Sequence, residues 1–151
     1  MPDASIRTLL TREESYAVHA LIYAAEHPGA SSARMARDLN FPPSFLAKVL
    51  GRLVEAGLLA SRTGRGGGVR VAGDAAKMSL LAVIEAVSGP MVVDTCQAMA
   101  VCATKARTGS CALNRAYYRA SAEIRRVLSE IRIEDLAGAD DPPPTVAESP
   151  E

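Results

Sequence analysis

Two short helical segments joined by a turn limit the fold of this chain more than any other feature. Residues 32–39 carry apolar side chains at helical spacing, and the Asn-Phe-Pro-Pro-Ser sequence of residues 40–44 forms a turn that starts the next helix. That helix has one apolar stripe, made of Leu46, Val49, Leu50 and Leu53, and Gly57 ends it. Its opposite face carries Ser44, Lys48 and Arg52, with Phe45 at the edge. The pattern predicts a helix-turn-helix with a polar and basic outer face.

A short hairpin, called the wing below, follows the two helices. Residues 58–62 and 69–71 are predicted to form its strands, and Thr63-Gly-Arg-Gly-Gly-Gly68 forms the tip. Glycine lets a phosphate backbone approach closely, and Arg62 and Arg65 can neutralise its charge. The tip is not a nucleotide-binding P-loop, because the Gly-Lys-Ser/Thr ending and the strand–loop–helix context are missing. The wing therefore predicts a contact with nucleic acid.

Further helices make the predicted fold mainly α with a small β-wing. Residues 12–26 have Thr11 as a plausible N-cap and two glutamates, Glu13 and Glu14, in the first turn, where negative charge suits the helix dipole. Residues 78–87 form another helix, with Ser79 as its cap.

A long helix is predicted from Ala112 to about Arg132. Its apolar residues alternate steps of four and three, in a seam of coiled-coil type: Leu113, Tyr117, Ala120, Ile124, Val127 (with Leu128) and Ile131. Such a seam needs a partner, and a two-fold homodimer is the commonest solution. A helix that folds back onto its own domain is a serious alternative.

All three cysteines of the chain lie in one segment that is predicted to be a loop: Cys96, Cys102 and Cys111. Thiolates bind iron–sulfur clusters and zinc, and they are also the nucleophiles of redox switches. No run of the chain resembles a signal peptide or a membrane span, so we expect a cytoplasmic protein whose cysteines stay reduced. The clustering favours metal binding or redox sensing over core packing or a structural disulfide.

The formal net charge of zero hides an uneven distribution of charge. Residues 31–70 hold seven basic side chains against two acidic ones, whereas residues 133–151 hold six acids and no base. The basic part predicts an anionic partner for one region of the molecule only. An enzyme is the least favoured class, because no acid–base pair, nucleophile triad or phosphate loop stands out.

The order of wing, cysteine segment and long helix resembles a known family. The residues that carry the resemblance are Tyr16-Ala-Val, Pro43-Ser-Phe-Leu46, Arg52-Leu with Ala56-Gly-Leu58, and Gly64-Arg-Gly-Gly-Gly68. They are similar to the Rrf-type winged helix-turn-helix regulators, the bacterial family that includes the cluster sensors IscR, NsrR and RirA and the cysteine regulator CymR. The family usually has proline where this wing has Arg65 and an aromatic residue at Val69.

The resemblance implies a homodimer that binds a palindromic operator in double-stranded DNA, without a membrane or a small-molecule substrate. It assigns DNA contacts to the outer helix face and the wing: Ser44, Phe45, Lys48, Arg52, Arg62, Thr63, Arg65 and Gly66. It assigns an iron–sulfur cluster to Cys96, Cys102 and Cys111. The chain then divides into a DNA-binding domain (10–90), a sensor loop (91–111), a dimerisation helix (112–136) and a disordered acidic tail (137–151).

Two departures from the family pattern leave the cluster type open between [2Fe–2S] and [4Fe–4S]. Eight residues separate the second and third cysteines, where five are common in the family, and Asn114 stands where IscR-like members have a histidine ligand. The fourth ligand can instead be a carboxylate from the partner subunit, for which Glu14 is the candidate. Two alternatives remain open: a thiol/disulfide switch on the same DNA-binding dimer without a cluster, and a small zinc-binding protein with no operator of its own.

Overall fold

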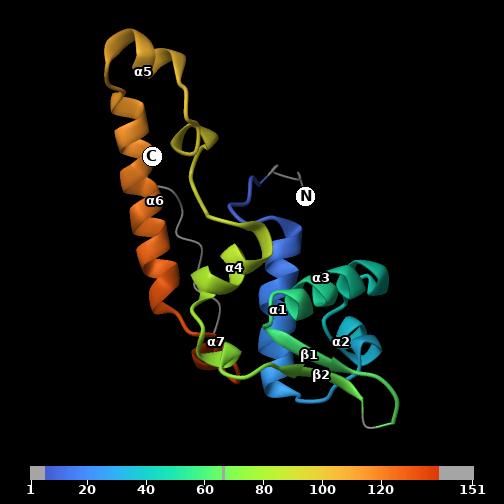
Figure 1. The fold of residues 1–151 in the computed structure, drawn as a ribbon. Helices are drawn as coiled ribbons and strands as arrows, with labels where there is room; N and C mark the ends of the chain where they lie inside the picture. The colour runs from blue at the N-terminus through green and yellow to red at the C-terminus, as the bar shows by residue number, and fades with distance from the viewer. Residues whose placement is uncertain (1–5, 66, 140–151) are drawn as a thin grey trace.

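The computed structural model describes residues 6–65 and 67–139 and confirms a mainly helical fold with a two-stranded antiparallel sheet (Figure 1). Its elements are α1 (Arg12–Glu26), α2 (Ser32–Asp38), α3 (Pro43–Glu55), β1 (Leu59–Arg62), β2 (Gly68–Val71), η1 (Ala75–Lys77), α4 (Leu80–Ser88), η2 (Thr95–Gln97), α5 (Ala103–Thr108), α6 (Ala112–Glu130) and α7 (Ile133–Leu136). Among the described residues, no helix is long and apolar enough to cross a membrane.

Helix α1 lies at the centre of the fold and packs against both α3 and α4. It begins at the predicted N-cap, where the Thr11 hydroxyl accepts the Glu14 N–H and the Glu14 carboxylate accepts the Thr11 N–H in return. Its buried face is rich in alanine (Ala17, Ala20 and Ala24), which lets neighbouring helices approach closely, and the α3 stripe predicted from Leu46 to Leu53 is buried against it. This core fixes the orientation of α3.

Helices α1 to α4 and the wing are called the head below. The base of the wing is hydrogen-bonded to the loop between α1 and α2. Strands β1 and β2 pair from Leu59 with Val71 to Arg62 with Gly68. The Gly29 N–H donates to the Val69 carbonyl and the Val69 N–H donates to the Ala30 carbonyl, each at 2.9 Å. Gly68 has a φ of 132°, and a Cβ there would lie 2.2 Å from the Gly29 carbonyl oxygen. Only glycine therefore fits this crossing of the wing and the α1–α2 loop.

Helix α6 runs beside α4 (Figure 1). Residues 91–111, called the sensor segment below, connect α4 to the far end of α6. One carboxylate joins these elements: Glu85 on α4 forms an ion pair with Arg125 on α6 and accepts the Met91 N–H at 2.8 Å. We call these three residues the junction. It ties the start of the sensor segment to both helices, so the two helices and the segment are held as one unit.

The last part of the chain returns to the core in a way that the sequence pattern did not indicate. Helix α6 ends at Glu130, slightly before the predicted end, and the backbone of residues 131–133 pairs with residues 78–80 through Leu80 N–H to Ile131 O (2.8 Å) and Ile133 N–H to Met78 O (3.1 Å). Ile133 is fully buried at the start of α7. Residues 140–151 lie outside the described residues, and with them most of the predicted acidic tail.

Replacing Ile133 with alanine tests the packing of α7. Because Ile133 is fully buried in the main core, we expect Ile133→Ala to lower the free energy of unfolding by about 2–5 kcal/mol, measured by urea denaturation. Glu134→Ala, at the exposed neighbouring position, should change it by less than about 0.5 kcal/mol. Equal stability of the two variants would contradict the packing of α7 in the core.

Candidate sensor pocket and nucleic-acid interface

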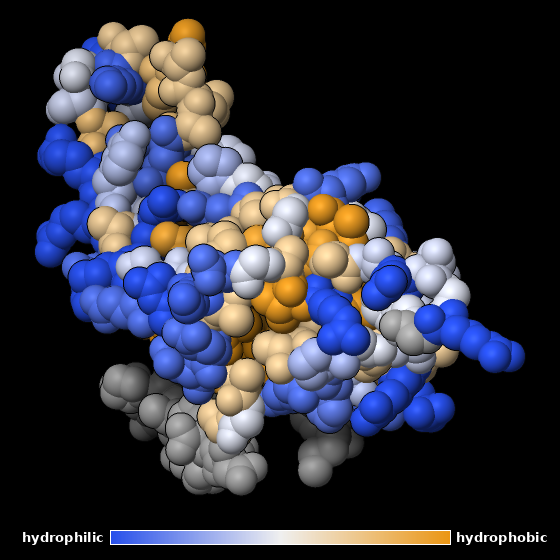
Figure 2. Space-filling view, turned by 60° about the horizontal axis from the view of Figure 1, so that its bottom comes forward, coloured by the Kyte–Doolittle hydropathy of each residue, from blue (hydrophilic) through white to orange (hydrophobic). Residues whose placement is uncertain are grey.

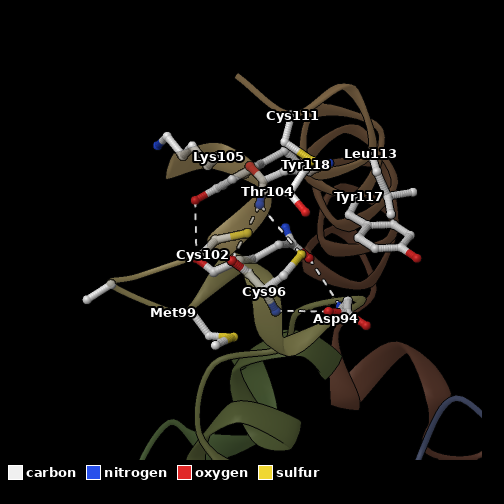
Figure 3. Close-up of a pocket in the computed structure, with 13 residues that line it drawn as sticks. Asp94, Cys96, Met99, Cys102, Thr104, Lys105, Cys111, Leu113, Tyr117 and Tyr118 are labelled. Atoms are coloured by element: carbon white, nitrogen blue, oxygen red, sulfur yellow. Dashed lines mark hydrogen bonds between the residues drawn. The ribbon is translucent and has the colours of Figure 1, made fainter. Parts of the chain in front are cut away.

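The three cysteines line one cavity of about 320 Å³, at the far end of α6 (Figure 3). Cys96 lies in η2, Cys102 is the N-cap of α5, and Cys111 is the N-cap of α6. All three are free thiols and half buried. Three separate helical elements therefore meet at this cavity: η2, which contains Cys96, and the N-terminal ends of α5 and α6.

Asn114 contacts two of the three cysteines. Its backbone N–H donates to Cys111 Sγ at 3.4 Å, and its side-chain Nδ2 donates to Cys96 Sγ at 3.6 Å and to the Cys96 carbonyl at 3.4 Å. The carboxylate of Asp94 accepts the Cys96 N–H at 2.9 Å and caps η2. Asn114 stands where the family resemblance leads one to expect a histidine ligand, and in this structure it is a hydrogen-bond donor to sulfur.

The thiols differ in their electrostatic surroundings. Backbone N–H groups of Lys105 and Thr104, together with the Lys105 charge, lower the pKa of Cys102 below its ordinary value. Burial raises the pKa of Cys96, and the nearby Asp94 carboxylate raises it further, against the opposing effect of Asn114. Cys102 therefore ionises more readily than Cys96.

A side-chain hub connects the pocket to the long helix. The Gln97 carbonyl oxygen Oε1 accepts the Val93 N–H at 3.0 Å, the Asp94 N–H at 3.3 Å and the Ser121 hydroxyl at 2.9 Å. The Val93 N–H also donates to Ser121 Oγ at 3.0 Å. Ser121 is the buried residue of α6. Neither Gln97 nor Ser121 stood out in the sequence, because the hydrogen bond that joins them spans 24 residues of the chain.

Glu14 lies far from this cavity in the same chain, at the start of α1. Its carboxylate is engaged in the capping box, and the residue is only 8% exposed. The structure thus gives Glu14 a local structural role. A ligand role toward a partner subunit would require this cap to open.

The second candidate site comprises the outer face of α3 and the wing. Figure 2 shows strongly hydrophilic side chains at the end of the molecule that carries the wing. Six predicted contact residues are exposed there: Ser44, Lys48, Arg52, Arg62, Thr63 and Arg65. A hollow of about 700 Å³ lies between α3 and the wing. Gly66, at the wing tip, lies outside the described residues.

Two predicted contact residues also make contacts within the fold: Arg52, whose side chain is still 44% exposed, and Phe45. The Arg52 guanidinium pairs with Glu13 at 2.9 Å and donates to the Val87 carbonyl at 3.5 Å, so it links α3 to α1 and α4. Phe45 is half buried and packs edge-on against Tyr16, with ring centroids 5.1 Å apart. Both side chains orient α3 from inside, and each still borders the exposed face.

Comparison with known proteins places this arrangement in context. The Rrf2 family, described as iron-dependent transcriptional regulators, matches residues 10–139. Protein aau3 of Rhizobium meliloti (strain 1021) is 33% identical over 138 residues, which cover 86% of this chain and 85% of that protein. The HTH-type transcriptional regulator IscR of Vibrio vulnificus is 31% identical over 131 residues, or 84% of this chain and 76% of the relative.

The fold is also similar to that of solved structures. The structure of CymR (YrzC), the global cysteine regulator of B. subtilis, has a TM-score of 0.71 at 21% identity, covering 90% of this chain and all of that chain. At this level of identity the likeness concerns the fold alone. It confirms the winged-helix architecture predicted from the sequence.

The difference between the thiols can be measured by alkylation. In the reduced, metal-free protein at neutral pH, we expect Cys102 to react with iodoacetamide faster than Cys96, because the thiolate is the reacting form. As the pH is lowered, Cys102 should retain reactivity further than Cys96. Peptide mass spectrometry at timed intervals measures both rates, and protein unfolded in urea provides the control in which the difference should vanish. Faster reaction of Cys96 in the folded protein would contradict this reading of the pocket.

Proposed function

The chain belongs to the Rrf2 family of transcriptional regulators, and we propose that it is a homodimer that binds a palindromic operator and senses redox, nitric oxide or iron status through an iron–sulfur cluster. It is not an enzyme, since the family and the structural neighbours are transcriptional regulators. The observation that carries the proposal is the cavity in which Cys96, Cys102 and Cys111 meet, on a helix that leads back to the DNA-binding head.

The donor set of the cavity fits a cluster. The three cysteine thiolates would hold it, and the N–H groups of Asn114 and Lys105 would stabilise the negative charge on sulfur. When bound, the cluster supplies a centre that oxidants, nitric oxide or iron loss can alter. Among the described residues, no three Cys, His, Asp or Glu side chains are close enough to hold a single metal ion. A single ion such as zinc would therefore require the sulfurs to move closer together, whereas a cluster takes thiolates on separate irons.

A series of contacts leads from the cavity to α3. Cys96 and Gln97 are adjacent in η2, so displacement of Cys96 acts on the bonds between Gln97, Val93 and Ser121. Those bonds lie next to the junction of Glu85, Met91 and Arg125. The C-terminal end of α4 is in turn bonded to α3 through the Val87 carbonyl and Arg52. Each step of this route is a contact within the described residues, which supports coupling between the cluster and α3.

The DNA-binding part of the proposal rests on the exposed cations. Ser44 and Lys48, at the N-terminal half of α3, are placed to reach base edges in a major groove. Arg62 and Arg65 on the wing suit phosphate groups. We assign Thr63 and Gly66 to the same backbone contact, and we assign Arg52 and Phe45 mainly to holding α3 in place.

The homodimer is supported by the part of the α6 seam that the head leaves uncovered. Leu113 is 57% exposed and Val127 is 46% exposed, and Ala116 and Ala120 lie between them on the same side of the helix. Other seam residues, such as Ile124 and Leu128, are partly covered by the molecule's own fold. Both arrangements considered from the sequence thus contribute: α6 folds back on α4 and still presents an apolar stripe to a second copy.

A thiol switch on the same dimer is the second candidate function. The observation in its favour is the position of Cys102 at the N-cap of α5, where backbone N–H groups of Thr104 and Lys105 stabilise a thiolate without any metal. Peroxide would oxidise Cys102 to a sulfenic acid, and the Cys96 or Cys111 thiol would then displace water to form a disulfide.

Anaerobic reconstitution with iron and sulfide tests the cluster. We expect a coloured protein with visible absorption and bound iron, and loss of both in Cys96→Ala, Cys102→Ala and Cys111→Ala. Ser110→Ala, beside the last cysteine, should keep its colour and iron. A colourless wild-type protein without iron would overturn the cluster proposal. If that protein forms an intramolecular disulfide with mild peroxide, the thiol switch takes its place, and bound zinc would favour a zinc site.

Two substitutions separate phosphate contacts from base contacts. A duplex that the wild-type protein selects from a random-sequence pool serves as the probe, beside a scrambled duplex. We expect Arg65→Ala to weaken binding to both and to lower the salt dependence by about one phosphate contact. Lys48→Ala should weaken binding to the selected duplex by about 1–3 kcal/mol and binding to the scrambled duplex by less. Lys77→Ala, an exposed cation paired with Asp74 away from α3, is the matched control. If all three variants bind both duplexes as tightly as the wild type, the proposed contacts of Lys48 and Arg65 with DNA are wrong.

A further inference from the structure

Gly51 is the one glycine inside a helix among the described residues, and it lies in the third turn of α3. Its backbone is ordinary right-handed helix, so no positive φ requires glycine there. A Cβ built at Gly51 meets no atom within 4 Å. The fold of this chain therefore neither needs nor benefits from glycine at this position, in contrast to Gly68 at the base of the wing.

Glycine inside an exposed helix lowers helix stability relative to alanine, because its backbone loses more freedom on folding. Local propensity and global fold usually agree in natural sequences, and disagreements concentrate at functional sites. A helix position that is weakened without any intramolecular gain indicates that the missing side chain matters outside the chain.

The position of Gly51 on α3 points to what lies outside. At about 100° per residue, Ser44, Lys48 and Gly51 fall within roughly 60° of arc. The buried stripe from Leu46 to Leu53 lies on the other side of the helix. Gly51 also lines the hollow of about 700 Å³ between α3 and the wing. It is therefore exposed on the same face as the proposed base-contacting residues, one turn further along the helix.

We infer that Gly51 is the position at which the backbone of α3 comes closest to DNA, so that the absence of a side chain there sets the depth of α3 in the major groove. The inference rests on the proposed DNA-binding function. Ser44 and Lys48 reach base edges only if the helix axis lies deep enough in the groove. A side chain at Gly51 would meet the DNA first and hold the N-terminal half of α3 away from the bases.

This role has a signature that a structural role does not have. Depth in the groove matters in the specific complex, in which base edges are contacted, and much less when a protein is held loosely by phosphates. Added bulk at Gly51 should thus reduce discrimination between sequences while the isolated protein becomes more stable. Stability and specific affinity are expected to change in opposite directions.

Gly51→Ala and Gly51→Leu test the inference, with the selected and scrambled duplexes as probes. We expect Gly51→Ala to raise the melting temperature by roughly 2–4 °C. It should weaken the selected duplex by roughly five- to fiftyfold, the scale of one lost base pair of recognition. Gly51→Leu should weaken it further, and binding to the scrambled duplex should change by no more than about twofold for either variant. Ala122→Leu adds the same bulk to an exposed position of α6 and should leave both affinities unchanged.

Three outcomes distinguish the possibilities. If Gly51→Ala binds the selected duplex as tightly as the wild type, the inference is wrong while the proposed function stands. If the variants lose both duplexes equally, or elute as a different oligomer on size exclusion, Gly51 serves assembly and the inference is also wrong. If the wild-type protein selects no duplex from the pool in any redox state, the proposed DNA binding fails, and the inference fails with it.

Discussion

The junction formed by Glu85, Met91 and Arg125 is the interaction on which the rest of the arrangement depends. Burial raises the pKa of Glu85, but the Met91 N–H and the Arg125 guanidinium outweigh it and hold the pKa below its ordinary value. A carboxylate with a lowered pKa in the folded state stabilises the fold above its unfolded pKa, and this contribution is lost as the pH falls through the folded pKa. The junction is thus intact at neutral pH. It fixes the start of the sensor segment, and together with the backbone pairing of residues 131–133 with residues 78–80 it holds α6 against α4.

Much of the head could be predicted because its signals are local. The N-caps at Thr11 and Ser79 and the apolar stripe of α3 each act within one or two turns, so a sequence pattern is enough to find them. The elements that were missed depend on distant partners. Helix α7 has only four residues and exists because Ile133 fills the core and residues 131–133 pair with residues 78–80. The short helices η2 and α5 were missed for a different reason, because three and six residues are too few to show a helical period of apolar side chains.

The candidate sites show the same division between local and distant signals. The grouping of the cysteines was visible in the sequence, as was the exposed face of Ser44 and Lys48. The sequence could not show that Asn114 reaches Cys96 across 18 residues or that Arg52 bonds to Val87 across 35. Such contacts follow from the packing of helices, which leaves no mark in a single sequence. Residues chosen by chemical type alone therefore include some, such as Arg52, whose main contacts lie inside the fold.

The positions that break local rules are the most informative about function. Ser121 is a buried polar residue, Gly51 weakens an exposed helix, and the three cysteines line one cavity. The structure explains the first: Ser121 completes the hub around Gln97. For the cysteines it shows hydrogen bonds from Asn114 to the sulfurs of Cys111 and Cys96. These bonds stabilise negative charge on sulfur, and the thiolate is the form that binds a metal or reacts with an oxidant. For Gly51 it supplies no partner at all. Because glycine at this position brings the fold itself no gain, we attribute its role to the DNA contact that we propose for α3.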